Sequence, residues 1–421
     1  MILLYKYILA HYKTVSFFVA LVFFLMDMSG FVGIIGYQLY YPMLFFMSYY
    51  CLKNNNKIGL NYILFLMACL LSIIVNTIPS YYNAPIRWCV FVLLLLSFSN
   101  LANSRKIALM RLHLFHIFSI LSVVIVVFSF LFLVLGLVNI EQMDLYIERG
   151  IYTGGTANNE MGILGAMSIL FISVFLYKHF SILKLWEKAV LFGCLYCGIS
   201  MMALASSRMG LICTLVSIMF AFYRMNRKKL SKLIATICIF VIGVSFVSNY
   251  MSEKFTFMLD KNKGQIERID IDSREEMWQS RMDEFSESPI FGVGFAYMKY
   301  GWGQGMASTQ SGRIESGSGW LSVLSQTGLL GGVCLLAVVM PCIFFLFRNK
   351  SDSYVNAWYS GMCMLFILQP ITEAYITTVG ALLGCLFWLN YSVIDSFRIG
   401  LLKDEDLDLR SYLYNSSKVN N

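Results

Sequence analysis

Apolar segments of about twenty residues follow one another along almost the whole chain, with only short polar turns between them. An α-helix needs about 20 apolar residues to cross the hydrocarbon core of a membrane. The alternating segments of about 10 residues that a membrane barrel would show do not occur in the sequence. We therefore predict an all-α polytopic membrane protein with about twelve transmembrane helices. The predicted spans are 14–30, 31–52, 58–78, 84–102, 112–138, 158–177, 188–205, 209–223, 233–250, 318–347, 354–372 and 377–395.

The composition supports this class, because 58% of the residues are hydrophobic and only 13% are charged. Soluble proteins carry roughly 25% charged residues, so most of this surface must face lipid. The formal net charge of +8 is spread over separate turns, which argues against nucleic acid as a partner. The eleven cysteines lie in apolar segments, so the sequence predicts neither a disulfide framework nor a metal site.

The positions of lysine and arginine predict the orientation, because both are retained on the cytoplasmic side of short loops. The opposite short loops contain no lysine and only Arg87, Arg149 and Arg208. No small-residue cleavage site follows the first apolar run, so we expect the first helix to be retained and both termini to be cytoplasmic. The basic residues of the cytoplasmic turns are Lys53 and Lys57; Arg105, Lys106 and Arg111; Lys178, Lys184 and Lys188; Arg224, Arg227, Lys228, Lys229 and Lys232; and Arg348 and Lys350.

One long polar stretch interrupts the apolar pattern and defines the predicted organisation. Residues 1–252 hold the first nine spans, 253–317 form a large extracytoplasmic loop, 318–395 hold the last three spans, and 396–421 form a cytoplasmic tail. A membrane protein with one large charged loop on one face usually handles a polar molecule there. The sequence therefore places the chemistry at this outer face.

The three outward arginines are the next strongest signal. An arginine at the outer membrane boundary runs against the orientation rule and is costly without a partner. Its guanidinium fork suits bidentate binding of phosphate or carboxylate. Each arginine has an alternative interpretation as an interfacial side chain that reaches lipid phosphate, and this alternative is favoured for Arg87.

Short motifs in the second half of the chain carry a resemblance to a known family. Their order and their predicted topology together resemble the O-antigen polymerase and ligase superfamily, over roughly residues 140–335. The motifs are Arg149 with Asn158 and Asn159; Ser207 and Arg208; Arg274 and Trp278; Pro289, Gly292 and Gly294; Trp320 and Leu321; and Gly328, Leu329, Leu330 and Gly331.

The resemblance implies a bacterial membrane glycosyltransferase of the inner membrane. Such enzymes use sugar chains carried on undecaprenyl or another polyprenyl diphosphate and transfer them to a sugar hydroxyl at the outer face. They need no nucleotide sugar, and as a class they need no cofactor and no metal. The implied partners are the lipid-linked oligosaccharide, membrane lipid, a flippase and a chain-length regulator. The products implied are O-antigen of lipopolysaccharide, capsule or exopolysaccharide.

The same resemblance assigns the candidate site residues. Arg208 and Arg274 would be catalytic contacts of the leaving diphosphate, where fixed cations stabilise developing negative charge. The substrate-binding candidates are Arg149, Asn159, Arg281, Trp278 and Trp320.

A departure from the ligase pattern concerns the group that orients or deprotonates the acceptor hydroxyl. In the ligase branch a histidine commonly stands four residues before the leucine that aligns with Leu321, and here that position is Gly317. All four histidines of the chain fall on or near the predicted cytoplasmic side. We therefore expect Glu315 to be the catalytic carboxylate, with a solvated loop carboxylate as the alternative interpretation.

The large loop itself is expected to contain short amphipathic helices between 254 and 287. Met277, Trp278 and Met282 share one face of such a helix. The following glycine-rich segment interleaves aromatic residues that could stack on sugar rings, namely Phe295, Tyr297, Tyr300 and Trp302.

Three functions remain open from the sequence. A polymerase of lipid-linked repeat units leads, because the ligase histidine is missing. A ligase that attaches glycan to lipid A-core or protein is the second, and a transporter of lipid-linked sugars is the third. Transporters often show repeats and midspan charges, whereas here the polar groups gather at one face.

Overall fold

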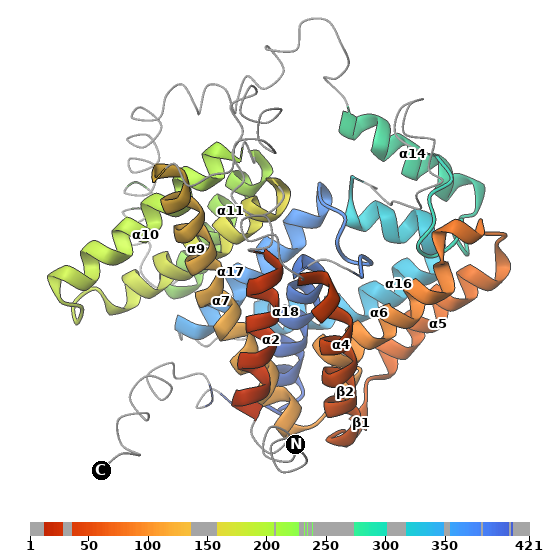
Figure 1. The fold of residues 1–421 in the computed structure, drawn as a ribbon, viewed down its shortest axis with the longest axis horizontal. Coiled ribbons are helices and arrows are strands. Elements are labelled where there is room, and N and C mark those ends of the chain that lie inside the picture. The colour runs from red at the N-terminus through yellow and green to blue at the C-terminus, as the bar shows by residue number, and fades with distance from the viewer. Residues whose placement is uncertain are drawn as a thin grey trace, which may run out of the picture.

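The computed structural model describes residues 12–27, 36–135, 158–205, 208–226, 273–300, 317–348, 354–379, 382–403 and 406, with 231, 234 and 238 as isolated positions. Within these residues the secondary structure is almost entirely helical (Figure 1). The α-helices are α2 (Tyr12–Asp27), α4 (Gly36–Lys53), α5 (Leu60–Val75), α6 (Ala84–Phe98), α7 (Arg105–Val134), α9 (Asn158–His179), α10 (Leu185–Leu204), α11 (Arg208–Asn226), α14 (Ser273–Glu287), α16 (Gly319–Arg348), α17 (Tyr354–Leu368) and α18 (Leu382–Arg398). Short 3₁₀ helices lie at η1 (Ser80–Tyr82) and η4 (Gln369–Ile371).

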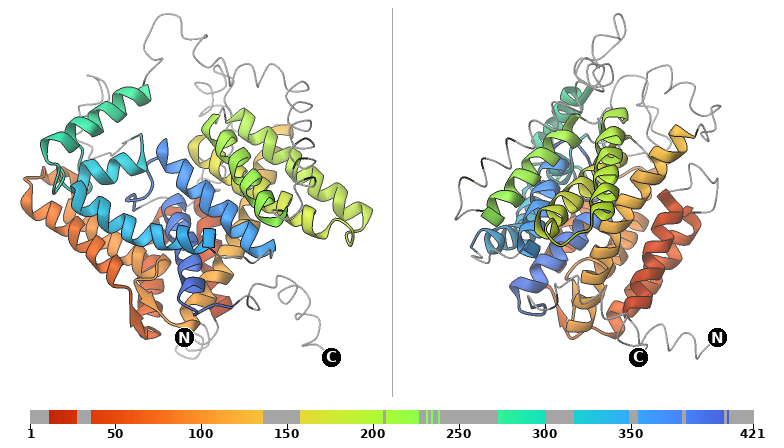
Figure 2. Two further views of the ribbon diagram at one scale, coloured as in Figure 1. Left: turned by 180° about the vertical axis from the view of Figure 1, so that it is seen from behind. Right: turned by 90° about the vertical axis from the view of Figure 1, so that its left-hand side faces the viewer.

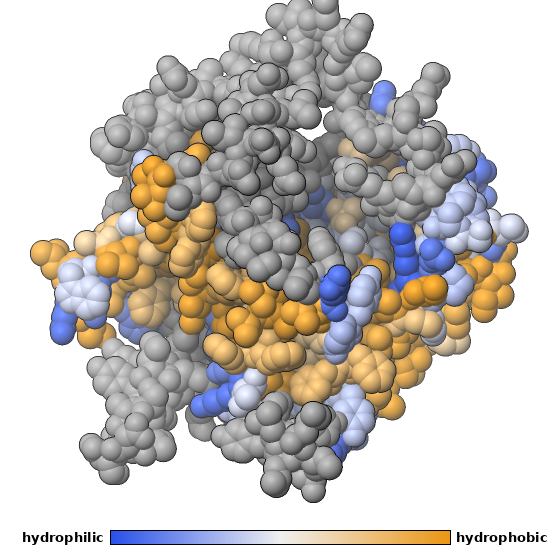
Figure 3. Space-filling view, in the orientation of Figure 1, coloured by the Kyte–Doolittle hydropathy of each residue, from blue (hydrophilic) through white to orange (hydrophobic). Residues whose placement is uncertain are grey.

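The membrane class is confirmed by the helices themselves. Six described helical segments are long and apolar enough to cross a membrane, and three shorter apolar helices accompany them. Figure 3 shows hydrophobic side chains in a band across the middle of the molecule, with hydrophilic ones above and below it. Every predicted span except 233–250 overlaps a described helix, and that span lies largely outside the described residues.

Two predicted spans differ in detail from the structure. Helix α7 begins at Arg105 rather than near 112, because the Ser104 side chain caps it by accepting a hydrogen bond from the amide of Ile107. Helix α16 is not one continuous helix, because Gly328 adopts φ 63° and ψ −165° inside it. Figure 2 shows the two parts of α16 meeting at an angle.

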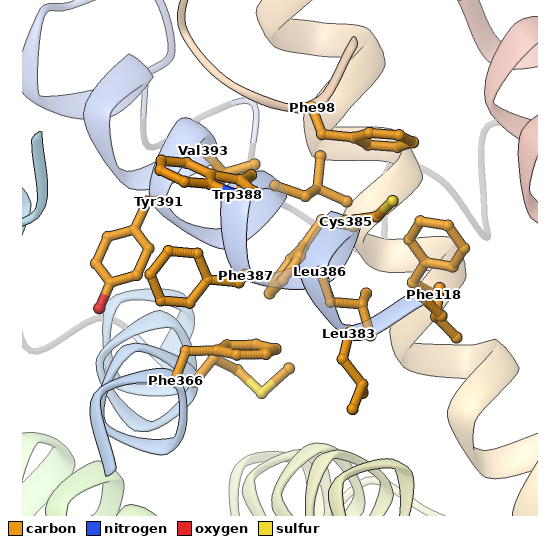
Figure 4. Packing of buried hydrophobic residues seen from close by; sticks show 14 of the residues in the cluster. Phe98, Phe118, Phe366, Leu383, Cys385, Leu386, Phe387, Trp388, Tyr391 and Val393 are labelled. Atoms are coloured by element: carbon orange, nitrogen blue, oxygen red, sulfur yellow. The ribbon is translucent and has the colours of Figure 1, made fainter. Parts of the chain in front are cut away.

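Helix α18 forms the centre of the packed structure. Its side chains are buried on every face from Leu382 to Ser396, whereas α10 exposes Leu185, Trp186 and Val190 as a lipid-facing helix does. Figure 4 shows Phe387, Trp388 and Tyr391 of α18 among aromatic side chains of the surrounding helices. A helix that is buried on every face lies where other helices surround it, and α18 covers most of the last predicted span.

Two of the predicted cytoplasmic turns lie together at one end of the molecule. The turns after α4 and α6 pair as a short antiparallel ladder, β1 (Lys57–Ile58) with β2 (Ala102–Asn103). Arg105 then forms an ion pair of 2.9 Å with Asp406 of the tail. Both described ends of the chain lie toward this end, at the bottom of Figure 1. The turns after α4 and α6 and the start of the tail therefore lie together at one end of the described structure.

Candidate active site

The break in α16 is filled by the backbone of the segment that follows α14. Residues 289–294 run across the break, and four backbone hydrogen bonds join the two segments. They replace the bonds that the helix loses at Gly328, which is the condition for irregular backbone at membrane depth. Two of these bonds run from the loop to the helix: Val293 N–H donates to Ser325 at 2.8 Å, and Gly294 N–H donates to Gln326 at 3.1 Å. The other two run from the helix to the loop: Leu329 N–H donates to Pro289 at 2.7 Å, and Leu330 N–H donates to Ile290 at 3.2 Å.

Two glycines of the sequence motifs make this junction possible. Gly292 has φ 69°, and a Cβ there would lie 2.4 Å from the carbonyl carbon of Gln326. A Cβ on Gly328 would lie 2.3 Å from the carbonyl oxygen of Ile290. Each glycine therefore meets the backbone of the other segment, and only a residue without a side chain fits. The motif Pro289–Gly294 therefore packs directly against the motif Gly328–Gly331.

Polar side chains tie this junction to α5. The Ser72 hydroxyl donates to the carbonyl of Gln326 at 2.5 Å, and the Asn76 amide donates to the carbonyl of Gly292 at 3.0 Å. Gln326, which is fully buried, accepts from the amide of Ala296 at 3.2 Å through its side-chain oxygen. The loop after α14 is thus fixed to two membrane helices.

Helix α14 is held by a buried ion pair that the sequence reasoning missed. Arg281 and Glu284 lie 2.9 Å apart, with side-chain exposures of 2% and 0%. The Glu284 carboxylate also accepts the amides of Lys299 and Tyr300 at 2.7 and 2.9 Å, and Arg281 donates to the carbonyl of Tyr300. Burial raises the pKa of the Glu284 carboxyl, while Arg281 and the two amides oppose this shift. The three-residue spacing of the pair on a helix is the signal that could have revealed it.

The segment that enters α16 packs directly under α14. Gly317 has φ 67°, and a Cβ there would lie 3.0 Å from Cβ of Met277. The Trp278 indole donates to the carbonyl of Gly317 at 3.4 Å. A histidine at position 317 would need a left-handed backbone and would press on Met277. Met282, predicted to share this packed face, is instead exposed.

Trp320 lies on the other side of the same segment. Its indole donates to the carbonyl of Ile367 at 3.0 Å, and its ring meets Phe387 edge-on at 6.3 Å. The neighbouring Gly319 approaches the carbonyl of Glu373, because a Cβ on Gly319 would lie 3.0 Å from that carbonyl oxygen. The start of α16 is therefore seated on the chain that links α17 to α18.

The remaining predicted site residues with a described backbone share one feature. Asn159, Arg208, Arg274 and Trp320 are each the first or second residue of a helix, namely α9, α11, α14 and α16. Helix N-termini carry the positive end of the helix dipole and unsatisfied amides, which favour anions. The side chains of Asn159, Arg208 and Arg274 are not among those described, and Arg149 and Glu315 lie outside the described residues.

Segment 369–379 brings α11 and α16 to the same region. Helix η4 contacts both α11 and α16, and Cys213 of α11 and Tyr375 are both buried in the hydrophobic core. Gly319, at the N-terminus of α16, approaches Glu373 and Ile376 of the same segment. This segment therefore lies between the start of α16, which carries Trp320, and helix α11, which begins at Arg208.

Residues 192–336 match the family model described as O-antigen ligase. The match begins in α10, includes α11 and α14, and ends in α16 just after the junction at Gly328. This segment is an O-antigen ligase family domain. No curated protein matches the chain. The O-antigen ligase family domain contains Arg208, Arg274, Trp278, Arg281 and Trp320, whereas Arg149 and Asn159 precede it.

The family comparison supports the predicted class of protein. The chain is a polytopic membrane protein with an O-antigen ligase family domain, a family of membrane enzymes that act on lipid-linked sugars. The matched residues include both segments that meet at the α16 junction. The glycine motifs used to recognise the family are therefore the residues that shape this junction.

Proposed function

We propose that this protein is a bacterial polysaccharide polymerase. It transfers an oligosaccharide from polyprenyl diphosphate to a hydroxyl of another lipid-linked repeat unit, at the outer face of the inner membrane. The acceptor oxygen forms a bond to the anomeric carbon, and the bond from that carbon to the diphosphate breaks. The electron pair leaves with the polyprenyl diphosphate, and Glu315 takes the proton of the hydroxyl.

The observation that carries this proposal is the shared position of the site residues at helix N-termini. Arg208 and Arg274 each belong to the first turn of a helix, so in this proposal their positive charges add to the helix dipoles that favour an anion. A leaving diphosphate gains negative charge in the transition state, and fixed cations stabilise it there. Arg149 supplies a third cation in this proposal, and Asn159 lies in the first turn of α9.

Arg281, Trp278 and Trp320 take a different role in the proposal. Arg281 is paired with Glu284, while Trp278 and Trp320 donate to backbone carbonyls. We infer that these three side chains position α14 and the start of α16 around the substrate. Met277 and Trp278 cover Gly317, next to the segment that holds Glu315.

Ligase activity is the second candidate, because the family model is described as O-antigen ligase. The conformation of Gly317 argues for the polymerase. The position where the ligase branch commonly has a histidine is occupied here by a glycine with φ 67° against Met277. An acceptor site without that histidine fits transfer to a lipid-linked repeat unit, with Glu315 as the base.

The decisive experiment supplies the purified protein with its lipid-linked oligosaccharide, extracted from cells that lack this chain. We expect a ladder of lengthening products without any nucleotide sugar. A single transfer to an added lipid A-core acceptor would establish the ligase. Movement of the oligosaccharide across vesicles without bond formation would establish a transporter.

Arg208→Lys tests the diphosphate contact in the same assay. We expect turnover to fall by about a hundredfold, because lysine offers a point charge where the guanidinium offers a fork. Arg348→Lys is the matched control. Arg348 is the last residue of α16, at the end of that helix opposite Trp320, and it should tolerate the change. Normal turnover of Arg208→Lys would return Arg208 to the role of an interfacial arginine.

A further inference from the structure

Tyrosines from two distant segments lie near the C-terminal end of α14, where ring contacts join Tyr81, Tyr82 and Tyr297, and where Tyr300 bonds to Glu287. Tyr81 and Tyr82 come from η1, and Tyr297 and Tyr300 come from the loop after α14. The Tyr81 and Tyr82 rings lie 4.8 Å apart, and Tyr82 meets Tyr297 edge-on at 5.0 Å. We call these four residues the outer tyrosine patch.

The patch has a rigid base and two exposed aromatic faces. Tyr82 is buried and donates to the carbonyl of Met298 at 3.1 Å, which ties η1 to the loop. Tyr81 and Tyr300 remain 41% and 37% exposed. The sequence prediction of sugar-stacking aromatics included Phe295, but this ring is fully buried against Phe91 at 5.3 Å, and Trp302 lies outside the described residues.

Charged groups border the exposed rings. The Lys299 ammonium lies 2.5 Å from the Glu287 carboxylate and 5.4 Å from the centre of the Tyr300 ring. The Tyr300 hydroxyl also bonds to Glu287. Figure 3 shows weakly hydrophilic and strongly hydrophilic side chains gathered at the right, where α14 and the α5–α6 turn lie in Figure 1. Charged groups of this kind remain in contact with water, so the exposed face of Tyr300 borders a solvated surface.

The chemistry of this surface fits a carbohydrate. Aromatic rings offer flat apolar faces for the C–H side of a sugar ring, and carboxylate, ammonium and phenol groups bond to its hydroxyls. We propose that the outer tyrosine patch is a distal subsite that holds the growing glycan chain. This inference rests on the proposed polymerase function and adds the place where the chain lies.

Helix α14 sets the distance between this subsite and the reacting end. Arg274 is at its N-terminal end and Glu287 at its C-terminal end, so the two lie about 20 Å apart at 1.5 Å per residue. That length spans several sugar rings. The patch therefore contacts the part of the chain remote from the diphosphate, and it controls how long the product stays bound between additions.

The test uses the double variant Tyr81→Leu/Tyr300→Leu. Polysaccharide length in cells that carry it is compared with the length in cells that carry the unaltered protein. Leucine keeps an apolar side chain but removes the ring. We expect the most abundant chain length to fall about fivefold, because each lost aromatic contact speeds release of the chain. In the purified protein we expect the rate of the first coupling of two repeat units to fall less than the chain length does.

Three controls keep the outcomes separate. Tyr81→Phe with Tyr300→Phe retains both rings and should retain long chains, and Tyr223→Leu removes a ring of similar exposure on α11 without effect. The single variant Tyr81→Leu covers the case in which the double variant fails to fold. The subsite proposal would be overturned if the leucine variant makes chains of normal length, whether its amount in the membrane is normal or lower. Absence of any polymer with the unaltered protein would instead overturn the proposed function itself.

Discussion

At the scale of single residues, Gly317 shows how one backbone angle limits chemistry. Its φ of 67° lies in the left-handed region, and Met277 occupies the space that a side chain would need. For L-residues with a Cβ this region costs about 1–2 kcal/mol. The glycine is therefore a packing requirement of this chain as well as a departure from the ligase pattern.

Replacement of Gly317 tests this argument. Gly317→Ala should lower the free energy of unfolding by about 1–2 kcal/mol, and Gly317→Asn should lower it less, because asparagine tolerates the left-handed region. Gly317→His should be the least stable of the three. Thermal unfolding in detergent measures all of them, and a histidine variant as stable as the unaltered chain would contradict the packing argument.

At the scale of elements, α16 acts as two helices joined by another segment. The outer part carries Trp320 and the longer part crosses the membrane, with Gly328 between them. The loop after α14 supplies the missing hydrogen bonds, so α14 and α16 hold each other in place. Both motif glycines act through this one junction.

Gly328→Ala should break that junction. The backbone there, at φ 63° and ψ −165°, is one that only glycine adopts readily, and the added Cβ would meet the carbonyl of Ile290. We expect a loss of about 3 kcal/mol in stability. Gly193→Ala in α10 is the matched control. A Cβ added at Gly193 would have no neighbouring atom within 4 Å, and alanine stabilises a helix relative to glycine. Equal stability of the two variants would show that the break tolerates a side chain.

The Arg281–Glu284 pair makes a second prediction for these elements. Removal of either partner leaves a buried charge, so Arg281→Met or Glu284→Gln should each cost about 3–5 kcal/mol. The double variant should lose less than the sum of the two. Glu287→Gln, in the exposed pair with Lys299, should change stability little. Strictly additive losses in thermal unfolding would argue that the two side chains do not depend on each other.

At the scale of the whole molecule, one end carries the basic turns and the other carries α14. The β1–β2 ladder and the Arg105–Asp406 pair fix the first end, while the junction of α16 fixes the second. The orientation rule assigns the basic end to the cytoplasm. The proposed reaction then takes place at the opposite membrane face, where a flipped lipid-linked substrate arrives.

Reporter fusions test this orientation. Alkaline phosphatase inserted after Asn83, in the turn between η1 and α6, should be active, because it folds only outside the cytoplasm. Green fluorescent protein inserted after Asn55, in the turn before β1, should fluoresce. The opposite pattern at both positions would invert the proposed topology and move the candidate site to the cytoplasmic face.

The sequence alone determined the class of protein, the place of nearly every helix and the family motifs. Hydropathy and charge are sums over neighbouring residues, so they are readable without any knowledge of distant contacts. The glycine motifs were also visible as spacings. Their sequence did not show that Gly292 and Gly328 face each other across a helix break.

Only the tertiary structure decided which polar groups find partners inside the protein. It paired Arg281 with Glu284, placed Trp278 on Gly317 and Trp320 on Ile367, and joined Tyr81 to Tyr297 through Tyr82. Most of these partners lie far apart in the sequence, so the contacts that hold these side chains could not be inferred from their neighbours in the chain. The physical reason is that a buried polar group must be satisfied by whatever group the fold brings next to it.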